Sequence, residues 1–134
     1  DTLLQESDFV TLHSPLNDDT RNMIGSRELS LMKPESFLIN CARGPLIDED
    51  ALYDALSGQQ IAGAGLDVMV DAEPPPDTPL FKLDNLLVTP HVAFISQQSL
   101  VDLRTRASNQ VVQCLRGEVP DNLVNPEILG SRDA

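Results

Sequence analysis

Four side chains in this sequence have the chemical types that acid–base chemistry on an anionic carbonyl compound requires: Arg43, Asp67, Glu73 and His91. The planar guanidinium of Arg43 can bind a carboxylate or a phosphate through two parallel hydrogen bonds. The imidazole of His91 can donate or accept a proton near neutral pH, and a nearby carboxylate would orient it and favour its charged form. No serine, cysteine or lysine stands out as a nucleophile. The four residues therefore predict anion binding and proton transfer.

Each of these residues lies at or just beyond the end of a predicted strand. The hydrophobic runs predict strands at residues 8–13, 36–40, 61–68 and 86–88. A helix that begins at Asp48 separates the second run from the third, and this order is typical of a parallel crossover. Because ligands bind outside the carboxyl ends of the strands in an open parallel sheet, we expect the four side chains to converge on one crevice.

The helices are predicted from their caps and from apolar residues spaced at threes and fours. They are expected at 2–7, at 27–32 behind an N-cap at Ser26, from 48 to a C-cap at Gly58, and from Ser96 to Gly117. The inward face of the third helix is expected to contain Ala51, Leu52, Ala55 and Leu56. Strands that alternate with helices predict the α/β class.

The bulk composition excludes several classes of protein. The chain has 134 residues, of which 41% are hydrophobic and 22% charged, a balance typical of a soluble globular domain. Its net charge of −12 repels phosphate backbones and anionic headgroups, so neither nucleic acid nor a membrane is an expected partner. Cys41 and Cys114 lack CxxC spacing, which predicts no metal site and no disulfide framework and favours the reducing cytoplasm.

Six motifs, in their order and spacing, resemble those of a known enzyme family. They are His13-Ser-Pro-Leu16 followed by Thr20 and Ile24, Ile39-Asn-Cys-Ala-Arg-Gly-Pro-Leu-Ile-Asp48, Gly65-Leu-Asp-Val68, Glu73-Pro74, Leu86-Leu-Val-Thr-Pro-His91, and Asn122-Leu-Val-Asn-Pro126. On these motifs the chain resembles the D-isomer-specific 2-hydroxy acid dehydrogenases, which include phosphoglycerate, glyoxylate and D-lactate enzymes. The resemblance covers most of the chain, and the combination of motifs is highly specific.

The resemblance implies an NAD-dependent oxidoreductase that interconverts D-2-hydroxy acids and 2-oxo acids. Arg43 would bind the substrate carboxylate and polarise the 2-oxo group, His91 would donate and accept the proton, and Glu73 would be the partner of His91. Asp67 would bind the nicotinamide end of the cofactor. The implied cofactor-binding residues are His13, Ser14, Pro15, Cys41, Ala42, Arg43, Asp67, His91, Ala93 and Phe94, of which the first three would line the adenosine half. NAD is the expected cofactor and NADP the alternative.

The resemblance also implies a partial Rossmann-like fold, an α/β three-layer arrangement with three or four parallel strands. A dinucleotide fold needs a G-x-G-x-x-G turn and then an acidic residue about 20 positions later, and this sequence has neither. Residues 1–117 are therefore expected to be the C-terminal portion of an NAD-binding domain that lacks its N-terminal half. Residues 118–134 are expected to form an arm that returns to a missing substrate domain. We expect the segment alone to be inactive and its exposed sheet edge to favour a homo-oligomer.

The sequence departs from the family pattern at two places. Six positions separate Asp67 from Glu73, one more than in the family pattern, so Asp71 competes with Glu73 as the partner of His91. Phe94 lies near a position where glycine often occurs, and its bulk leaves the size of the substrate open. Two other functions stay open: an NAD-sensing binding protein similar to corepressor relatives of the family, and an inactive truncated segment.

Overall fold

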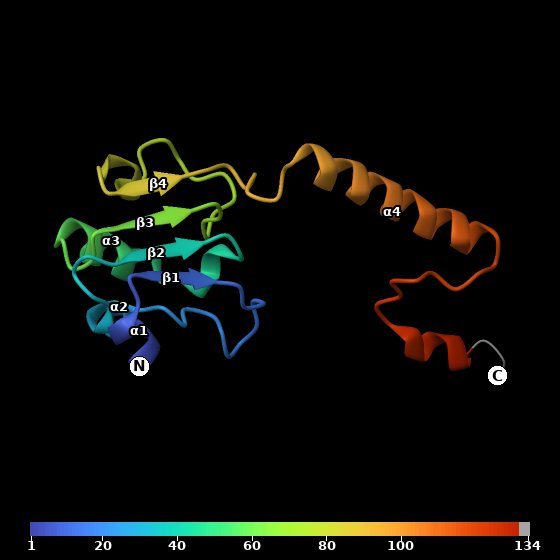
Figure 1. Cartoon of the computed structure of the whole chain (residues 1–134), viewed down its shortest axis with the longest axis horizontal. Coiled ribbons are helices and arrows are strands. Elements are labelled where there is room, and N and C mark those ends of the chain that lie inside the picture. The colour runs from blue at the N-terminus through green and yellow to red at the C-terminus, as the bar shows by residue number, and fades with distance from the viewer. Residues whose placement is uncertain (132–134) are drawn as a thin grey trace. The chain divides into compact units, whose positions relative to one another are not determined.

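The computed structural model describes residues 1–131, which divide into two compact units between Ala93 and Phe94. The first unit contains a four-stranded sheet and the helices α1 to α3, and the second contains the long helix α4 (Figure 1). Short 3₁₀ helices lie at Gly44–Leu46, Pro79–Lys82 and Pro126–Ser131. Among the described helices, none has both the length and the hydropathy that crossing a lipid bilayer requires.

The sheet is parallel throughout, and its strands follow the order of the chain. They are β1 (Phe9–Leu12), β2 (Phe37–Asn40), β3 (Gly63–Leu66) and β4 (Leu86–Val88). The register pairs Leu12 with Asn40, Asn40 with Leu66, and Leu66 with Val88, so the four strands end level with one another. The predicted parallel sheet is confirmed, although the run at 61–68 forms a shorter strand than expected.

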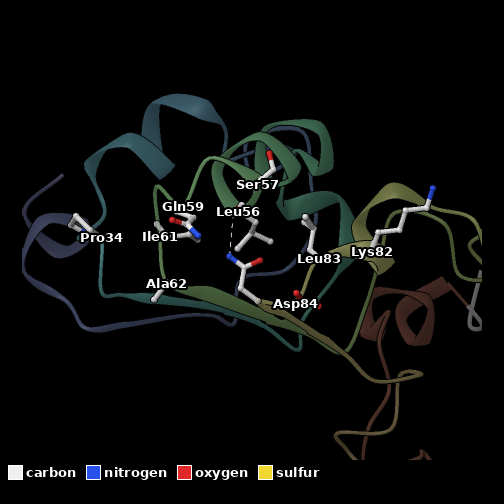
Figure 2. A pocket seen from close by; sticks show the side chains of 10 residues that line it. Pro34, Leu56, Ser57, Gln59, Ile61, Ala62, Lys82, Leu83 and Asp84 are labelled. Carbon is white, nitrogen blue, oxygen red and sulfur yellow. Dashed lines mark hydrogen bonds between the residues drawn. The ribbon is translucent and has the colours of Figure 1, made fainter.

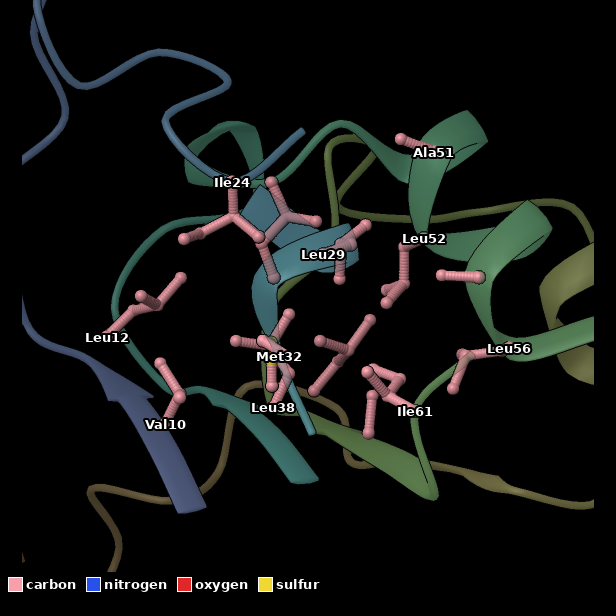
Figure 3. Close-up of a cluster of buried hydrophobic side chains, with 14 of the residues drawn as sticks. Val10, Leu12, Ile24, Leu29, Met32, Leu38, Ala51, Leu52, Leu56 and Ile61 are labelled. Atoms are coloured by element: carbon pink, nitrogen blue, oxygen red, sulfur yellow. The ribbon is translucent and has the colours of Figure 1, made fainter. Parts of the chain in front are cut away.

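The core lies between the sheet and the helices α2 (Ser26–Leu31) and α3 (Glu49–Ser57), as Figure 3 shows. Since the strands are in sequential order, right-handed crossovers place the connecting helices on the same face of the sheet. The helix α1 (Thr2–Glu6) packs on α2 and adds Leu4 to the core. The fully buried side chains include Leu29, Leu38, Leu46, Ile47, Leu52, Leu56 and Ile61.

The other face of the sheet carries apolar side chains that stay exposed. Phe9 and Leu87 are 65% and 68% exposed. The ring of Phe9 stacks on that of Phe37 with 5.5 Å between the ring centroids. The first unit therefore has two of the three layers that the sequence predicts, and a parallel sheet is normally covered on both faces.

The helix α3 begins and ends as predicted. The carboxylate of Asp48 accepts hydrogen bonds from the N–H groups of Asp50 and Ala51, which satisfies two donors of the first turn. The inward face is as expected, with Ala51, Leu52, Ala55 and Leu56 buried. Gly58 is the C-cap, but the residue with positive φ is the next one, Gln59, at 55°.

The helix α2 begins one residue earlier than predicted, with Gly25 rather than Ser26 at the N-cap. The carboxylate of Glu28 accepts a hydrogen bond from the Gly25 N–H at 3.1 Å. A guanidinium hydrogen bond from Arg27 and this backbone bond lower the pKa of Glu28. The N-terminal end of α2 is therefore stabilised by one of the two bonds of a capping box, the bond from the N-cap N–H to the Glu28 side chain, because the glycine N-cap has no side chain to form the other.

The second unit is built on α4 (Gln97–Leu115), whose predicted limits are confirmed. The Ser96 hydroxyl accepts a hydrogen bond from the Ser99 N–H at 3.0 Å, and Gly117, with φ of 75°, follows the C-terminal end. The 3₁₀ helix at 126–131 lies within the predicted arm, residues 118–134. The last three residues of that arm, 132–134, lie outside the described residues.

Candidate active site at the carboxyl ends of the strands

Arg43 lies in the loop that follows β2, where the sequence predicts it. Its side chain is exposed, and Nη1 donates a hydrogen bond to the Ala42 carbonyl oxygen at 2.7 Å. The next residue, Gly44, is buried against the loop that follows β3: a Cβ at Gly44 would lie 2.0 Å from the Met69 carbonyl oxygen. Only glycine fits this contact. The loop that follows β3 therefore constrains the backbone next to Arg43.

Asp67 is the first residue after β3 and is only 4% exposed. Its Oδ1 accepts hydrogen bonds from the Thr89 hydroxyl at 2.5 Å and from the Val92 N–H at 2.9 Å. Its Oδ2 accepts one from the Ala93 N–H at 2.9 Å. Desolvation alone would raise the pKa of this carboxyl, but the three hydrogen bonds and the charge of His91 outweigh it, so the pKa lies below its ordinary value. Asp67 is therefore a charged anchor for the loop after β4.

His91 lies inside the loop that Asp67 anchors. Its N–H donates to the Asp67 carbonyl oxygen at 2.9 Å, and its side chain is exposed. Its φ is 54°, in the left-handed region that residues other than glycine seldom adopt. A non-glycine residue is held there only when its surroundings determine the conformation, and such residues cluster at functional sites.

Glu73 and Asp71 lie in the irregular loop that follows β3. Both are exposed, and the Glu73 N–H donates to Asp71 Oδ1 at 3.0 Å. Asp71 Oδ1 is therefore used within its own turn, whereas within residues 1–131 the Glu73 carboxylate accepts no such bond.

A hollow of about 700 Å³ lies at the carboxyl ends of β1 and β2. It is lined by His13, Ser14, Pro15, Leu16, Cys41, Ala42 and Arg43, which include six of the residues predicted to bind a cofactor. The imidazole Nε2 of His13 lies 3.0 Å from the Thr11 hydroxyl, which fixes the direction of the ring. Loops that follow two neighbouring strands thus line one open hollow with both polar and apolar side chains.

A second hollow, of about 590 Å³, lies at the opposite ends of the strands (Figure 2). It is lined by Pro34, Leu56, Ser57, Gln59, Ile61, Ala62, Lys82, Leu83, Asp84 and Asn85. The Asn85 amide donates to the Leu56 carbonyl oxygen at 3.1 Å, and the Lys82 side chain points away from the labelled side chains of the hollow. None of the predicted site residues lines this second hollow.

The structure places Arg43, Asp67 and His91 after the level ends of three neighbouring strands, β2, β3 and β4. Ala93 joins them through its hydrogen bond to Asp67, and Phe94 is the first residue of the second unit. Asn40, Gly44 and Thr89 lie within the motifs that the sequence shows, but the sequence indicated no role for any of the three. One sequence feature could have indicated the role of Asn40, namely that it is a polar residue at the end of the hydrophobic run 37–39. A side-chain amide at such a buried position is expected to be hydrogen-bonded.

No three His, Cys, Asp or Glu side chains within residues 1–131 gather closely enough to hold a metal ion. Cys41 and Cys114 are both free and exposed. The polar groups of the site are therefore a guanidinium, imidazoles, hydroxyls and carboxylates.

Comparison with known proteins identifies the family of the chain. Residues 1–93 match the family described as D-isomer specific 2-hydroxyacid dehydrogenase, NAD binding domain. A glyoxylate reductase of Korarchaeum cryptofilum is 45% identical over 97% of this chain and 39% of its own length. A glyoxylate/hydroxypyruvate reductase B of Pectobacterium carotovorum is 43% identical over 96% of this chain and 40% of its own length.

A solved structure gives the same result. The NAD-complexed D-isomer specific 2-hydroxyacid dehydrogenase of Lactobacillus delbrueckii ssp. bulgaricus superposes with a TM-score of 0.84 at 38% identity, over 92% of this chain and 42% of that one. The chain thus spans about 40% of the length of these relatives. With a parallel four-stranded α/β unit that matches the family over residues 1–93, the chain belongs to the D-isomer specific 2-hydroxyacid dehydrogenases, of whose NAD-binding domain it forms a portion.

Proposed function

We propose that the complete product of the gene that carries this sequence is an NAD-dependent reductase of small 2-oxo acids, with the D-2-hydroxy acid as product. The observation that carries the proposal is the position of Arg43, Asp67 and His91 after three level, neighbouring strands. The relatives named as glyoxylate and hydroxypyruvate reductases make these two compounds the first substrates to test.

In this proposal Arg43 binds the carboxylate of the 2-oxo acid through two parallel hydrogen bonds and polarises the adjacent carbonyl. Among residues 1–131, the exposed guanidinium of Arg43 forms no hydrogen bond or ion pair with a carboxylate, which leaves it available for an anionic substrate. When bound, the reduced dinucleotide supplies the hydride that adds to the carbonyl carbon. The protonated imidazole of His91 donates its proton to the carbonyl oxygen, and in the oxidative direction the neutral imidazole takes that proton back.

Glu73 is proposed as the carboxylate partner that orients His91. The choice of Glu73 over Asp71 rests on the hydrogen bond between the Glu73 N–H and Asp71 Oδ1, which commits Asp71 to its own turn. A carboxylate beside the imidazole favours the protonated form that acts as the acid.

The hollow at the ends of β1 and β2 suits one part of a dinucleotide. It offers the Ser14 hydroxyl, the His13 ring and the backbone from Cys41 to Arg43 as polar groups. In the proposal His13, Ser14 and Pro15 line the adenosine half, and Asp67, His91, Ala93 and Phe94 lie toward the nicotinamide. NAD is the proposed cofactor and NADP is the alternative that a binding comparison would decide.

We further propose that residues 1–117 serve as part of the nucleotide domain, that residues 118–134 serve as an arm, and that the protein acts in the cytoplasm as a homo-oligomer. The free thiols of Cys41 and Cys114 suit a reducing compartment. The exposed apolar side chains of Phe9 and Leu87 support self-association. Sedimentation of the complete protein tests the last point, and a single monomeric species would contradict it.

The test is NADH oxidation by the complete protein with glyoxylate and with hydroxypyruvate. We expect turnover in the wild type, and its loss in His91→Ala with dinucleotide affinity retained. Dinucleotide binding without turnover of any 2-oxo acid would favour the NAD-sensing alternative. Neither binding nor turnover would favour an inactive segment, and for the 134-residue chain alone we expect little enhancement of NADH fluorescence.

A further inference from the structure

The side chain of Asn40, the last residue of β2, is buried and holds the loop of Arg43. It is 1% exposed. Its Nδ2 donates to the Arg43 carbonyl oxygen at 2.9 Å, and its Oδ1 accepts from the Ala42 N–H at 3.0 Å. Both ends of the amide are therefore used on two consecutive residues of the loop. The side chain fixes the backbone from which the guanidinium extends.

The side chain of Asp67 holds the loop of His91 in a similar way. Its carboxylate takes hydrogen bonds from Thr89, Val92 and Ala93, which lie on both sides of His91 in the chain. These three bonds close the loop around the one residue that has a φ of 54°. The left-handed backbone at His91 is thus enforced from outside the residue itself.

The two anchors are joined to each other through the main chain. The Asp67 N–H donates to the Asn40 carbonyl oxygen at 2.9 Å, and the His91 N–H donates to the Asp67 carbonyl oxygen at 2.9 Å. A continuous series of hydrogen bonds therefore runs from the backbone of Arg43 through Asn40 and Asp67 to the backbone of His91.

Simple satisfaction of buried polar groups accounts for part of this pattern, because a buried amide or carboxylate must find partners. It does not account for the choice of partners. Among residues 1–131, the hydrogen bonds of the Asn40 and Asp67 side chains go to the loops that contain Arg43 and His91. Asn40 ends β2, and Asp67 directly follows Leu66, the register partner of Asn40. Networks of this kind fix site geometry to within fractions of an ångström.

We propose that Asn40 and Asp67 are positioning residues that act as a coupled pair and set the geometry between Arg43 and His91. For Asp67 this is a role in addition to its proposed contact with the cofactor. The catalytic consequence rests on the proposed function, whereas the coupling between the two loops does not depend on it.

The first test measures amide hydrogen exchange in the 134-residue chain. Thr89→Val removes one donor to Asp67 at an exposed position, and Thr89→Ser keeps that donor as the matched control. We expect Thr89→Val to speed exchange at Val92 and Ala93 by about tenfold. Through the coupling we expect it to speed exchange at Ala42 by about threefold, and Thr89→Ser to change neither.

The converse variant is Asn40→Ser, which shortens the other anchor. We expect faster exchange at Val92 and Ala93 as well as at Ala42. If Asn40→Ser fails to fold, Thr89→Val still tests the coupling, because Thr89 is not part of the core. Effects confined to the loop of the substituted anchor would overturn the proposal.

The second test measures kinetics in the complete protein with glyoxylate. We expect Thr89→Val to lower kcat by about tenfold with NADH affinity within about twofold of the wild type, and Thr89→Ser to restore kcat. Altered exchange with unchanged kcat would overturn the positioning role. A wild type that lacks turnover would refute the proposed function, and the exchange at Ala42 would still decide whether the two loops are coupled.

Discussion

The two ends of the sheet are built from similar loops but differ in what holds those loops. At the carboxyl ends, buried Asn40 and Asp67 direct their polar atoms outward into the loops of Arg43 and His91. At the amino ends, the hydroxyl of buried Ser36 donates to the Lys33 carbonyl oxygen at 2.7 Å and closes the turn before β2. In the hollow shown in Figure 2, the Asn85 amide donates to the Leu56 carbonyl oxygen at 3.1 Å and closes the end of α3, so these bonds hold a turn and a helix end that carry neither Arg43 nor His91.

A hollow alone therefore does not identify a functional site. The two hollows have similar volumes, about 700 and 590 Å³. Both adjoin constrained backbone: Gln59, with φ of 55°, lines the hollow at the amino ends, and a left-handed His91 and a closely packed Gly44 lie in the loops at the carboxyl ends. Only the constrained loops at the carboxyl ends carry a guanidinium and an imidazole, those of Arg43 and His91. Constraint of loop backbones that carry chemically capable side chains is the better guide to function.

The largest effect is expected from a substitution that removes the proposed proton donor at the carboxyl ends of the strands and leaves the amino ends unchanged. In the complete protein, His91→Gln should lower kcat for glyoxylate reduction by about 10²- to 10⁴-fold, because it removes the proton donor. Lys82→Ala, at the amino-end hollow, should leave kcat within about twofold. Equal losses in both variants would remove the distinction between the two ends.

Arg43→Lys keeps the charge but loses the planar fork. We expect KM for glyoxylate to rise by about 10- to 100-fold, since a charge-assisted hydrogen bond contributes about 1.5–3 kcal/mol. Steady-state kinetics over a range of glyoxylate concentrations measures the change. An unchanged KM would show that Arg43 does not bind the carboxylate.

Gly44→Ala tests the close contact that supports the Arg43 loop. The new Cβ would lie 2.0 Å from the Met69 carbonyl oxygen, so the free energy of unfolding should fall by about 1–3 kcal/mol in urea denaturation. Gly65→Ala is the matched control, because a Cβ there meets nothing within 4 Å. Similar losses in the two variants would mean that the contact at Gly44 does not constrain the loop.

Asn85→Ala tests the amino ends of the strands by the same measurement, the free energy of unfolding. The loss of the bond to Leu56 should lower the free energy of unfolding by about 0.5–1.5 kcal/mol, with turnover of the complete protein unchanged. A drop in kcat of tenfold or more would show that this end also takes part in the reaction.

The smallest expected effect is a dependence on pH. Because the pKa of folded Asp67 is lowered, its stabilising contribution is complete above the ordinary value of 3.8 and is lost only as pH falls through the lower, folded pKa. The amide chemical shifts of Val92 and Ala93 should therefore titrate with a midpoint below 3.8. A midpoint at or above that value would contradict the charged anchor.

Much of the first unit could be predicted from the sequence because local signals agreed. Hydrophobic runs gave four strands, and Asp48 and Gly58 limited α3. The predicted α/β class and partial Rossmann-like fold are confirmed. Within the first unit the helices cover one face of the sheet, because sequential parallel strands place their helices on the same face. The capping of α2 by Gly25 was missed because the stabilising group is the Glu28 side chain, three residues away.

For the candidate site, the sequence predicted which residues follow the ends of the strands, but not the hydrogen bonds that hold their loops. The types of Arg43 and His91 indicated chemistry, and the register placed both at one edge. The anchoring by Asn40 and Thr89 was not predictable, because a side-chain hydrogen bond between loops far apart in sequence leaves no periodic pattern. The proposed roles of Glu73 and Phe94 stay predictions.

The location of the reaction can be measured by hydrogen–deuterium exchange of the complete protein, with NADH and the non-reducible 2-oxo acid analogue oxamate. We predict slower exchange in peptides that cover residues 13–16, 40–44 and 89–93, and no change in those that cover 57–62 and 82–85. Protection of the amino-end peptides with the carboxyl-end peptides unchanged would contradict the claim that the chemistry takes place at the loops of Arg43 and His91.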